Sequence, residues 1–94
     1  MNKVEAKRII RAELETYRAK PYSELVQMID VEPVTGEVVL PSGKRYQIEI
    51  KAFWDDKPNG NIRIVAAIDD GGWRTFVPLC DGFIKSPTNE FIGE

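Results

Sequence analysis

Histidine is missing from the 94-residue sequence altogether. Without an imidazole the chain cannot build a Ser-His-Asp triad, a Cys–His pair or a histidine-ligated metal site. Cysteine is nearly absent as well. Cys80 is the single cysteine, so no internal disulfide can form. One thiolate cannot complete a structural zinc site either. We therefore expect a chain that is not an enzyme and that binds no cofactor.

Long apolar runs are also lacking. The longest, residues 64–68, is far below the ~20 residues that a membrane-spanning helix needs. The first residues, Met1–Glu5, do not contain the apolar centre of a signal peptide. A single free cysteine suits a reducing compartment, and we interpret Cys80 as a small buried apolar residue. The sequence thus predicts a cytoplasmic protein without membrane contact.

The charges nearly balance, with 13 Lys and Arg against 15 Asp and Glu, which gives a net charge of −2. That balance provides no general attraction to nucleic acids or anionic membranes. The distribution is uneven, because residues 1–20 carry six basic and three acidic side chains. We interpret the basic end as a solvated helix face, and a basic helix that meets an acidic surface or RNA is the alternative. Length and composition indicate one folded domain, 1–94.

Residues 3–30 predict two helices. Apolar residues recur at helical spacing over 3–19, and Pro21 then ends the first helix and suits the first turn of a second one, over 21–30. After Pro33 the apolar period changes to 2, which predicts strands at 36–40, 44–54, 62–68 and 73–79. Residues 81–94 form either a short hairpin around 86–89 or an extended tail.

These elements predict an α+β fold in which two N-terminal helices pack on one face of a four-stranded antiparallel meander, the sheet part being 36–79. The apolar alternation also predicts which side chains face the helices. The expected core consists of Leu14, Leu25, Ile48, Ile50, Ile64, Ile68 and Val77.

Aspartates gather in the turns of the predicted sheet. Asp55 and Asp56 follow the second strand, and Asp81 follows the predicted fourth strand, so all three would lie at one end of the meander. Clustered carboxylates could hold a hard cation there. The stronger interpretation is that aspartate is a favoured turn residue, so the metal site is a weaker candidate.

The outer face of the predicted sheet is mixed rather than fully polar. Large apolar side chains out of phase with the core are Phe53, Val65 and Phe76, with Arg63 and Arg74 beside them. Exposed apolar patches often mark interfaces, so we expect a small protein–protein interaction module that binds a protein partner or a second copy of itself. Two alternatives remain: a small-molecule or enzymatic pocket between helices and sheet, and weak RNA binding through the outer face. The net negative charge disfavours nucleic acid.

Overall fold

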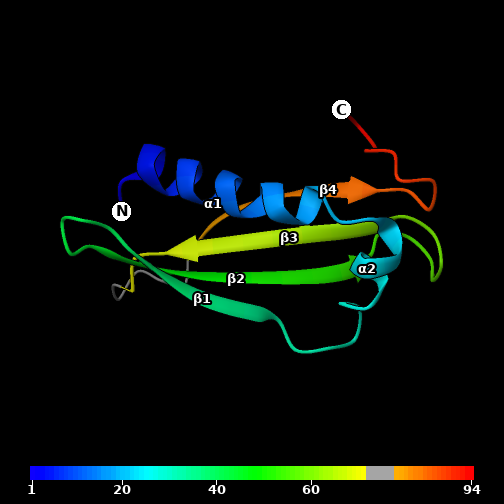
Figure 1. The fold of residues 1–94 in the computed structure, drawn as a ribbon, viewed down its shortest axis with the longest axis horizontal. Helices are drawn as coiled ribbons and strands as arrows, with labels where there is room; N and C mark the ends of the chain where they lie inside the picture. The colour runs from blue at the N-terminus through cyan, green and yellow to red at the C-terminus, as the bar shows by residue number, and fades with distance from the viewer. Residues whose placement is uncertain (72–77) are drawn as a thin grey trace.

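The computed structural model describes residues 1–71 and 78–94 and confirms the α+β fold (Figure 1). Helix α1 (Lys3–Arg18) and the short helix α2 (Tyr22–Val26) come first. They are followed by strands β1 (Val34–Val39), β2 (Arg45–Trp54), β3 (Ile62–Asp69) and β4 (Leu79–Lys85). The four strands form one antiparallel sheet in the order β1-β2-β3-β4, as expected for a meander.

Helix α1 begins at an asparagine cap and lies on one face of the sheet. The side-chain oxygen of Asn2 accepts a hydrogen bond of 3.1 Å from the backbone N–H of Glu5, which satisfies one free donor of the first turn. Ala6, Ile10 and Leu14 are the buried residues of this helix. They recur at intervals of four, so they form one stripe that packs mainly against β3 and β4.

The core lies between this stripe and the inner face of the sheet. Strand β2 alternates between exposed and buried residues along most of its length, and β3 buries every second residue from Ile62 to Ile68. Leu14, Leu25, Ile48, Ile50, Ile64 and Ile68 are all at most 6% exposed, which confirms those core predictions, while Val77 lies outside the described residues.

Strand β4 spans Leu79–Lys85 and shares only Leu79 with the strand predicted over 73–79. Residues 73–77 of that predicted strand lie outside the described residues. The predicted hairpin around 86–89 is present, with β4 itself as its first arm: the backbone N–H of Ser86 donates to the carbonyl of Glu90 at 2.8 Å. A single β-bridge then joins Lys85 to Phe91.

Gly82 marks the closest approach of β4 to β3. A Cβ atom at this position would lie 2.2 Å from the carbonyl oxygen of Ile64. Real Cβ atoms essentially never come within 3.0 Å of another heavy atom, so no side chain fits here without a shift of the backbone. The local geometry of β4 therefore depends on this glycine.

The last residue of β4 and the segment that follows it contact the end of α1. Lys85 is only 5% exposed, and its ammonium group donates hydrogen bonds of 2.9 and 2.7 Å to the carbonyl oxygens of Arg18 and Lys20. It thereby satisfies carbonyl groups left free at the helix end. The Arg18 guanidinium lies 4.0 Å from the centre of the Phe91 ring and forms an ion pair with Glu94. The C-terminus thus lies on the helix side of the sheet (Figure 1).

Candidate functional site

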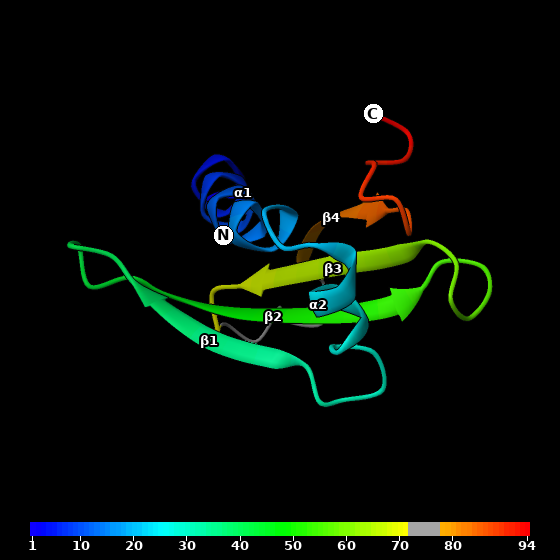
Figure 2. The same ribbon diagram turned by 45° about the vertical axis from the view of Figure 1, so that its right-hand side comes forward.

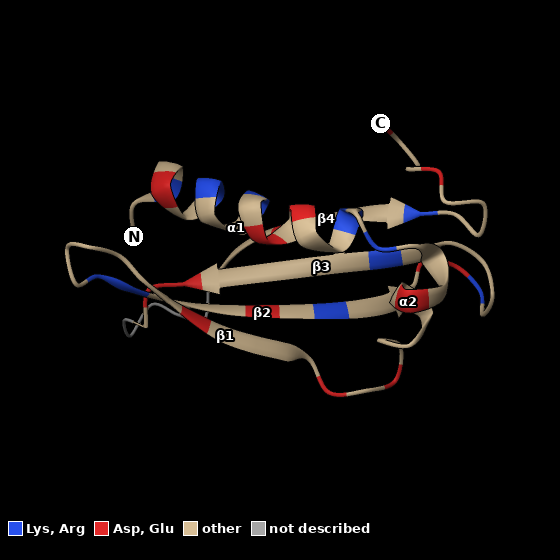
Figure 3. Ribbon diagram, viewed as in Figure 1, with Lys and Arg blue, Asp and Glu red and all other residues tan. Residues whose placement is uncertain are grey.

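Strand β1 forms one edge of the sheet, and no other described strand pairs with its outer side. Helix α1 packs chiefly on β3 and β4, and α2 contacts β3, so the helices pack mainly on the strands away from β1 (Figure 2). Five of the six residues of β1 are exposed. An edge strand presents a row of unpaired N–H and C=O groups, and natural proteins usually protect such edges with charges, proline or a covering segment. Here only Pro33, directly before the strand, and Glu37, the one charged residue of β1, serve that purpose (Figure 3).

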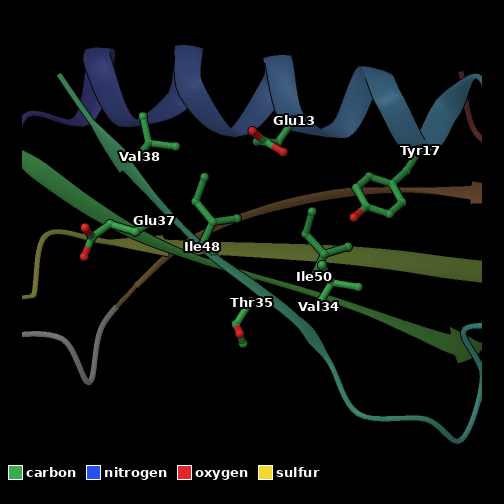
Figure 4. A pocket seen from close by; sticks show the side chains of 9 residues that line it. Glu13, Tyr17, Val34, Thr35, Glu37, Val38, Ile48 and Ile50 are labelled. Carbon is green, nitrogen blue, oxygen red and sulfur yellow. The ribbon is translucent and has the colours of Figure 1, made fainter.

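A groove of about 170 Å³ runs along the inner side of this edge, between α1 and β1 (Figure 4). Its floor is apolar and comes from β1 and β2. Its wall consists of two side chains that project from successive turns of α1, Glu13 and Tyr17. The apolar floor is formed by Val34, Val38, Ile48 and Ile50.

Glu13 and Tyr17 supply the polar chemistry of the groove. Burial raises the pKa of the Tyr17 phenol, and the nearby carboxylate of Glu13 raises it further. The phenol therefore keeps its proton at neutral pH and can donate a hydrogen bond, while the carboxylate can accept one. Pockets for drug-sized molecules usually measure ~300–1,000 Å³, so this groove has room for only one or two amino-acid side chains.

A second hollow, wider and open to solvent, lies where β1 begins. It measures about 700 Å³ and is lined in part by Val31, Pro33, Phe53 and Trp54. Val31 is 53% exposed and Phe53 is 42% exposed, which is high for large apolar side chains. We refer to residues 31–39 together with Phe53 as the β1 margin. Four of the seven large apolar residues exposed in the described part of the chain belong to it: Val31, Val34, Val39 and Phe53.

The predicted partner surface on the outer face is only partly described. Phe53 and Arg63 are opposite each other in the pairing of β2 with β3, and Val65 is opposite Lys51. Phe76 and Arg74, which complete the predicted surface, lie within residues 72–77, outside the described residues. Phe53 is the one predicted residue that also belongs to the β1 margin.

Three basic side chains of this outer face that the structure describes already have neighbours. The guanidinium of Arg63 donates hydrogen bonds of 2.7 and 2.9 Å to Asp55. Arg45 lies 3.3 Å from a carboxylate oxygen of Glu37. Lys51 lies 5.2 Å from the centre of the Phe53 ring. RNA binding would require these cations to exchange their present contacts for phosphates.

The three aspartates of the weaker metal candidate do not come together. Asp81 lies inside β4 opposite Ala66, not after the strand, and its carboxylate is 3.7 Å from Arg11 of α1. Asp55 directly follows Trp54, which pairs with residue 62 of β3, whereas Asp81 pairs with residue 66 of β3. Positions 62 and 66 of β3 are ~13 Å apart at ~3.3 Å per residue. The prediction that Asp81 returns to the end of the sheet where Asp55 and Asp56 lie is therefore wrong. Within residues 1–71 and 78–94 no group of three potential metal ligands is present.

Cys80 is exposed, so its interpretation as a buried residue is wrong. It is paired with Ala67 in β4. The neighbouring residues 79, 81, 83 and 85 form the inward series of that strand, and this alternation directs Cys80 to the outer face.

Comparisons with known proteins do not identify this chain: no protein family, curated protein sequence or solved structure matches it. Of the two helices in the described ranges, neither has the length and apolar character required to cross a membrane. The function of the chain must therefore be inferred from the geometry of the β1 margin.

Proposed function

We propose that this chain is a small, non-catalytic, cytoplasmic interaction module that binds an extended protein segment along the free edge of β1. The observation that carries the proposal is the unpaired edge of β1 beside a groove with an apolar floor. In this mode of recognition the bound segment becomes an additional strand of the sheet.

Strand addition would use both parts of the site. The backbone of the bound segment would satisfy N–H and C=O groups that β1 leaves unpaired, which provides affinity without regard to sequence. Every second side chain of that segment would project over the inner face, where Val34 and Val38 form part of the groove floor. A groove of about 170 Å³ matches a side chain rather than a free metabolite.

The chemistry of the groove also suggests what the bound segment contains. Apolar side chains would lie against the floor, and ~25 cal/mol per Å² of apolar area removed from water would favour them. A lysine, arginine or amide side chain near α1 would find the carboxylate of Glu13 and the hydroxyl of Tyr17. These features favour an alternating segment with apolar side chains on the inner face, and a polar or basic side chain is accommodated beside α1 but is not required.

Selection of random linear peptides displayed on phage tests the proposal, with the intact chain immobilised as bait. The dissociation constants of selected peptides are then measured by fluorescence polarisation on the wild type and on two lysine variants. Val34→Lys places a charge at the edge, where residue 34 is 47% exposed, and should weaken binding by about tenfold or more. Val4→Lys adds the same charge at a residue of α1 that is 80% exposed and should leave binding within about twofold.

Hydrogen exchange provides the structural readout of the same complex. Bound peptide should slow amide exchange over residues 34–39, because strand pairing protects edge N–H groups. If no peptide is selected, or if Val34→Lys binds as tightly as Val4→Lys, the proposed mode of binding is wrong.

A further inference from the structure

We infer that the segment bound by β1 is β1 of a second copy of this chain, paired antiparallel about a two-fold axis at Gly36. This inference rests on the proposed function and names its partner. The four strands of each copy would then join into one continuous sheet. Two-fold interfaces are self-complementary, so the β1 margin must fit itself, and three of its properties satisfy that requirement.

The first property is the register. Residues opposite each other in an antiparallel pair must point to the same face, so the axis must pass through a residue rather than between two residues. Within Val34–Val39 only axes at Gly36 and Glu37 pair five residues of each copy. An axis at Glu37 would place two carboxylates opposite each other, which is destabilising. An axis at Gly36 places Thr35 opposite the partner's Glu37, where the hydroxyl can donate to the carboxylate.

The second property is the position of the apolar residues. With the axis at Gly36, Val34 lies opposite the partner's Val38 on the inner face, and this contact occurs twice. On the outer face, the exposed Val39 comes opposite the partner's Pro33, directly before the partner's β1. Self-pairing therefore covers Val34 and Val39, two of the exposed apolar residues of the β1 margin.

The third property is the absence of an obstacle. A side chain on the axis would face the same side chain of the partner, but Gly36 has no side chain. In addition, no atom lies within 4 Å of the position that a Cβ of Gly36 would take. The only ionisable side chain of β1 is Glu37, and it already accepts hydrogen bonds from Arg45 and Gln47. Helix α1 of each copy packs chiefly on β3 and β4, so the two copies of α1 would lie apart across the shared sheet (Figure 2).

The size of the contact determines its strength. Six residues of β1 span ~20 Å, so the strip buried between two edges remains below the ~1,200 Å² at which stable complexes begin. A dimer of this kind is weak and depends on protein concentration. It would exchange its partner strand readily, which is compatible with capture of a foreign segment at the same edge.

Sedimentation equilibrium of the intact chain between about 10 µM and about 1 mM tests the inference, because it covers the range expected for a weak dimer. The wild type and Val4→Lys should dimerise at the upper concentrations, and Val34→Lys should raise the dissociation constant by about tenfold or more. A wild type that remains monomeric throughout would overturn the inference. If peptides selected by display still bind that monomer and lose affinity in Val34→Lys, the proposed function survives without self-pairing.

Single cysteines test the register independently, in a Cys80→Ser background because Cys80 is exposed. Opposed Cβ atoms in such a pair are ~4.5–5.5 Å apart, close to disulfide geometry, so Gly36→Cys should cross-link to its own copy under mild oxidation. Val34→Cys should not, because its copy would be ~13 Å away. Cross-linking of Glu37→Cys in place of Gly36→Cys would refute the axis at Gly36. Circular dichroism verifies that each variant is folded, and the cross-linking result decides the case if Val34→Lys unfolds.

Discussion

The close approach at Gly82 gives the sharpest test of the fold. In Gly82→Ala the new Cβ would be 2.2 Å from the carbonyl oxygen of Ile64, and the next nearest atoms, at 3.2 and 3.3 Å, are also backbone. No side-chain rotation can relieve this contact. To reach 3.0 Å the two strands must separate by ~0.8 Å, which would stretch a ~2.9 Å hydrogen bond to ~3.7 Å, beyond hydrogen-bond range.

The magnitude follows from what that separation breaks. Two ladder hydrogen bonds at ~1 kcal/mol each, together with the disturbed packing of the adjacent Phe83, give a loss of about 3 kcal/mol in the free energy of unfolding. For a domain of this size that loss lowers the melting temperature by roughly 12–24 °C. Gly36→Ala is the matched control, because nothing lies within 4 Å of its added Cβ. It should be neutral or stabilise by ~0.4–1 kcal/mol, since alanine restricts the unfolded chain.

Urea unfolding followed by circular dichroism measures both variants, at a protein concentration low enough to keep the chain monomeric. Two equal slopes with midpoints far apart would support the argument. If Gly82→Ala unfolds within ~0.5 kcal/mol of Gly36→Ala, the strand spacing at this position is not as described, and the reasoning fails.

Three further substitutions test other parts of the fold. Ile64→Ala should cost ~2–5 kcal/mol in urea unfolding because the side chain is fully buried, whereas Val4→Ala, at a residue 80% exposed, should change little. Lys85→Met should cost about 2 kcal/mol in the same assay, because it leaves the carbonyl groups at the end of α1 without donors; an unchanged midpoint would contradict the capping role. Glu94→Gln should destabilise the fold at neutral pH but not in acid, because the hydrogen bond from Arg18 lowers the pKa of Glu94. The stability that this ion pair contributes is fully present above the usual carboxyl pKa of 4.5 and is lost as the pH falls through the lower pKa of the folded state. Equal destabilisation by Glu94→Gln at neutral pH and at a pH well below that range would refute the role of the ion pair.

The sequence predicted those elements whose pattern depends only on local alternation. In β2 every second residue is apolar and buried, so period 2 alone identified both the strand and its inner face. In β4 the inward series contains Asp81 and Lys85, which interrupt the apolar alternation. Their partners, Arg11 and the carbonyl groups near the end of α1, come from a distant part of the chain, and local pattern cannot reveal them. Local pattern therefore did not identify the whole of β4.

The candidate site was harder to predict than the core. The sequence shows that Val34 and Val39 are apolar, but not that α1 packs chiefly on β3 and β4 and that the outer side of β1 has no described partner strand. Which edge a helix leaves open depends on how its stripe fits the strands, a tertiary property. The outer-face prediction included Phe53, which does belong to the β1 margin. It missed Glu13, which reads as an ordinary surface position of a helix, and Tyr17, which falls near the apolar stripe of the first helix and reads as a core residue.

The order of the strands has a consequence for how quickly the molecule assembles. Each strand pairs with its immediate neighbour in the chain. In the β1–β2 turn, the N–H of Leu40 donates to the carbonyl of Lys44 and the N–H of Gly43 donates to the carbonyl of Leu40, so the first hairpin can form within microseconds. Helix α1 instead packs on β3 and β4, which lie far from it in the sequence, so its tertiary contacts form only after those strands are in place. Substitutions in the hairpin should therefore slow refolding, whereas substitutions between α1 and β4 should mainly accelerate unfolding.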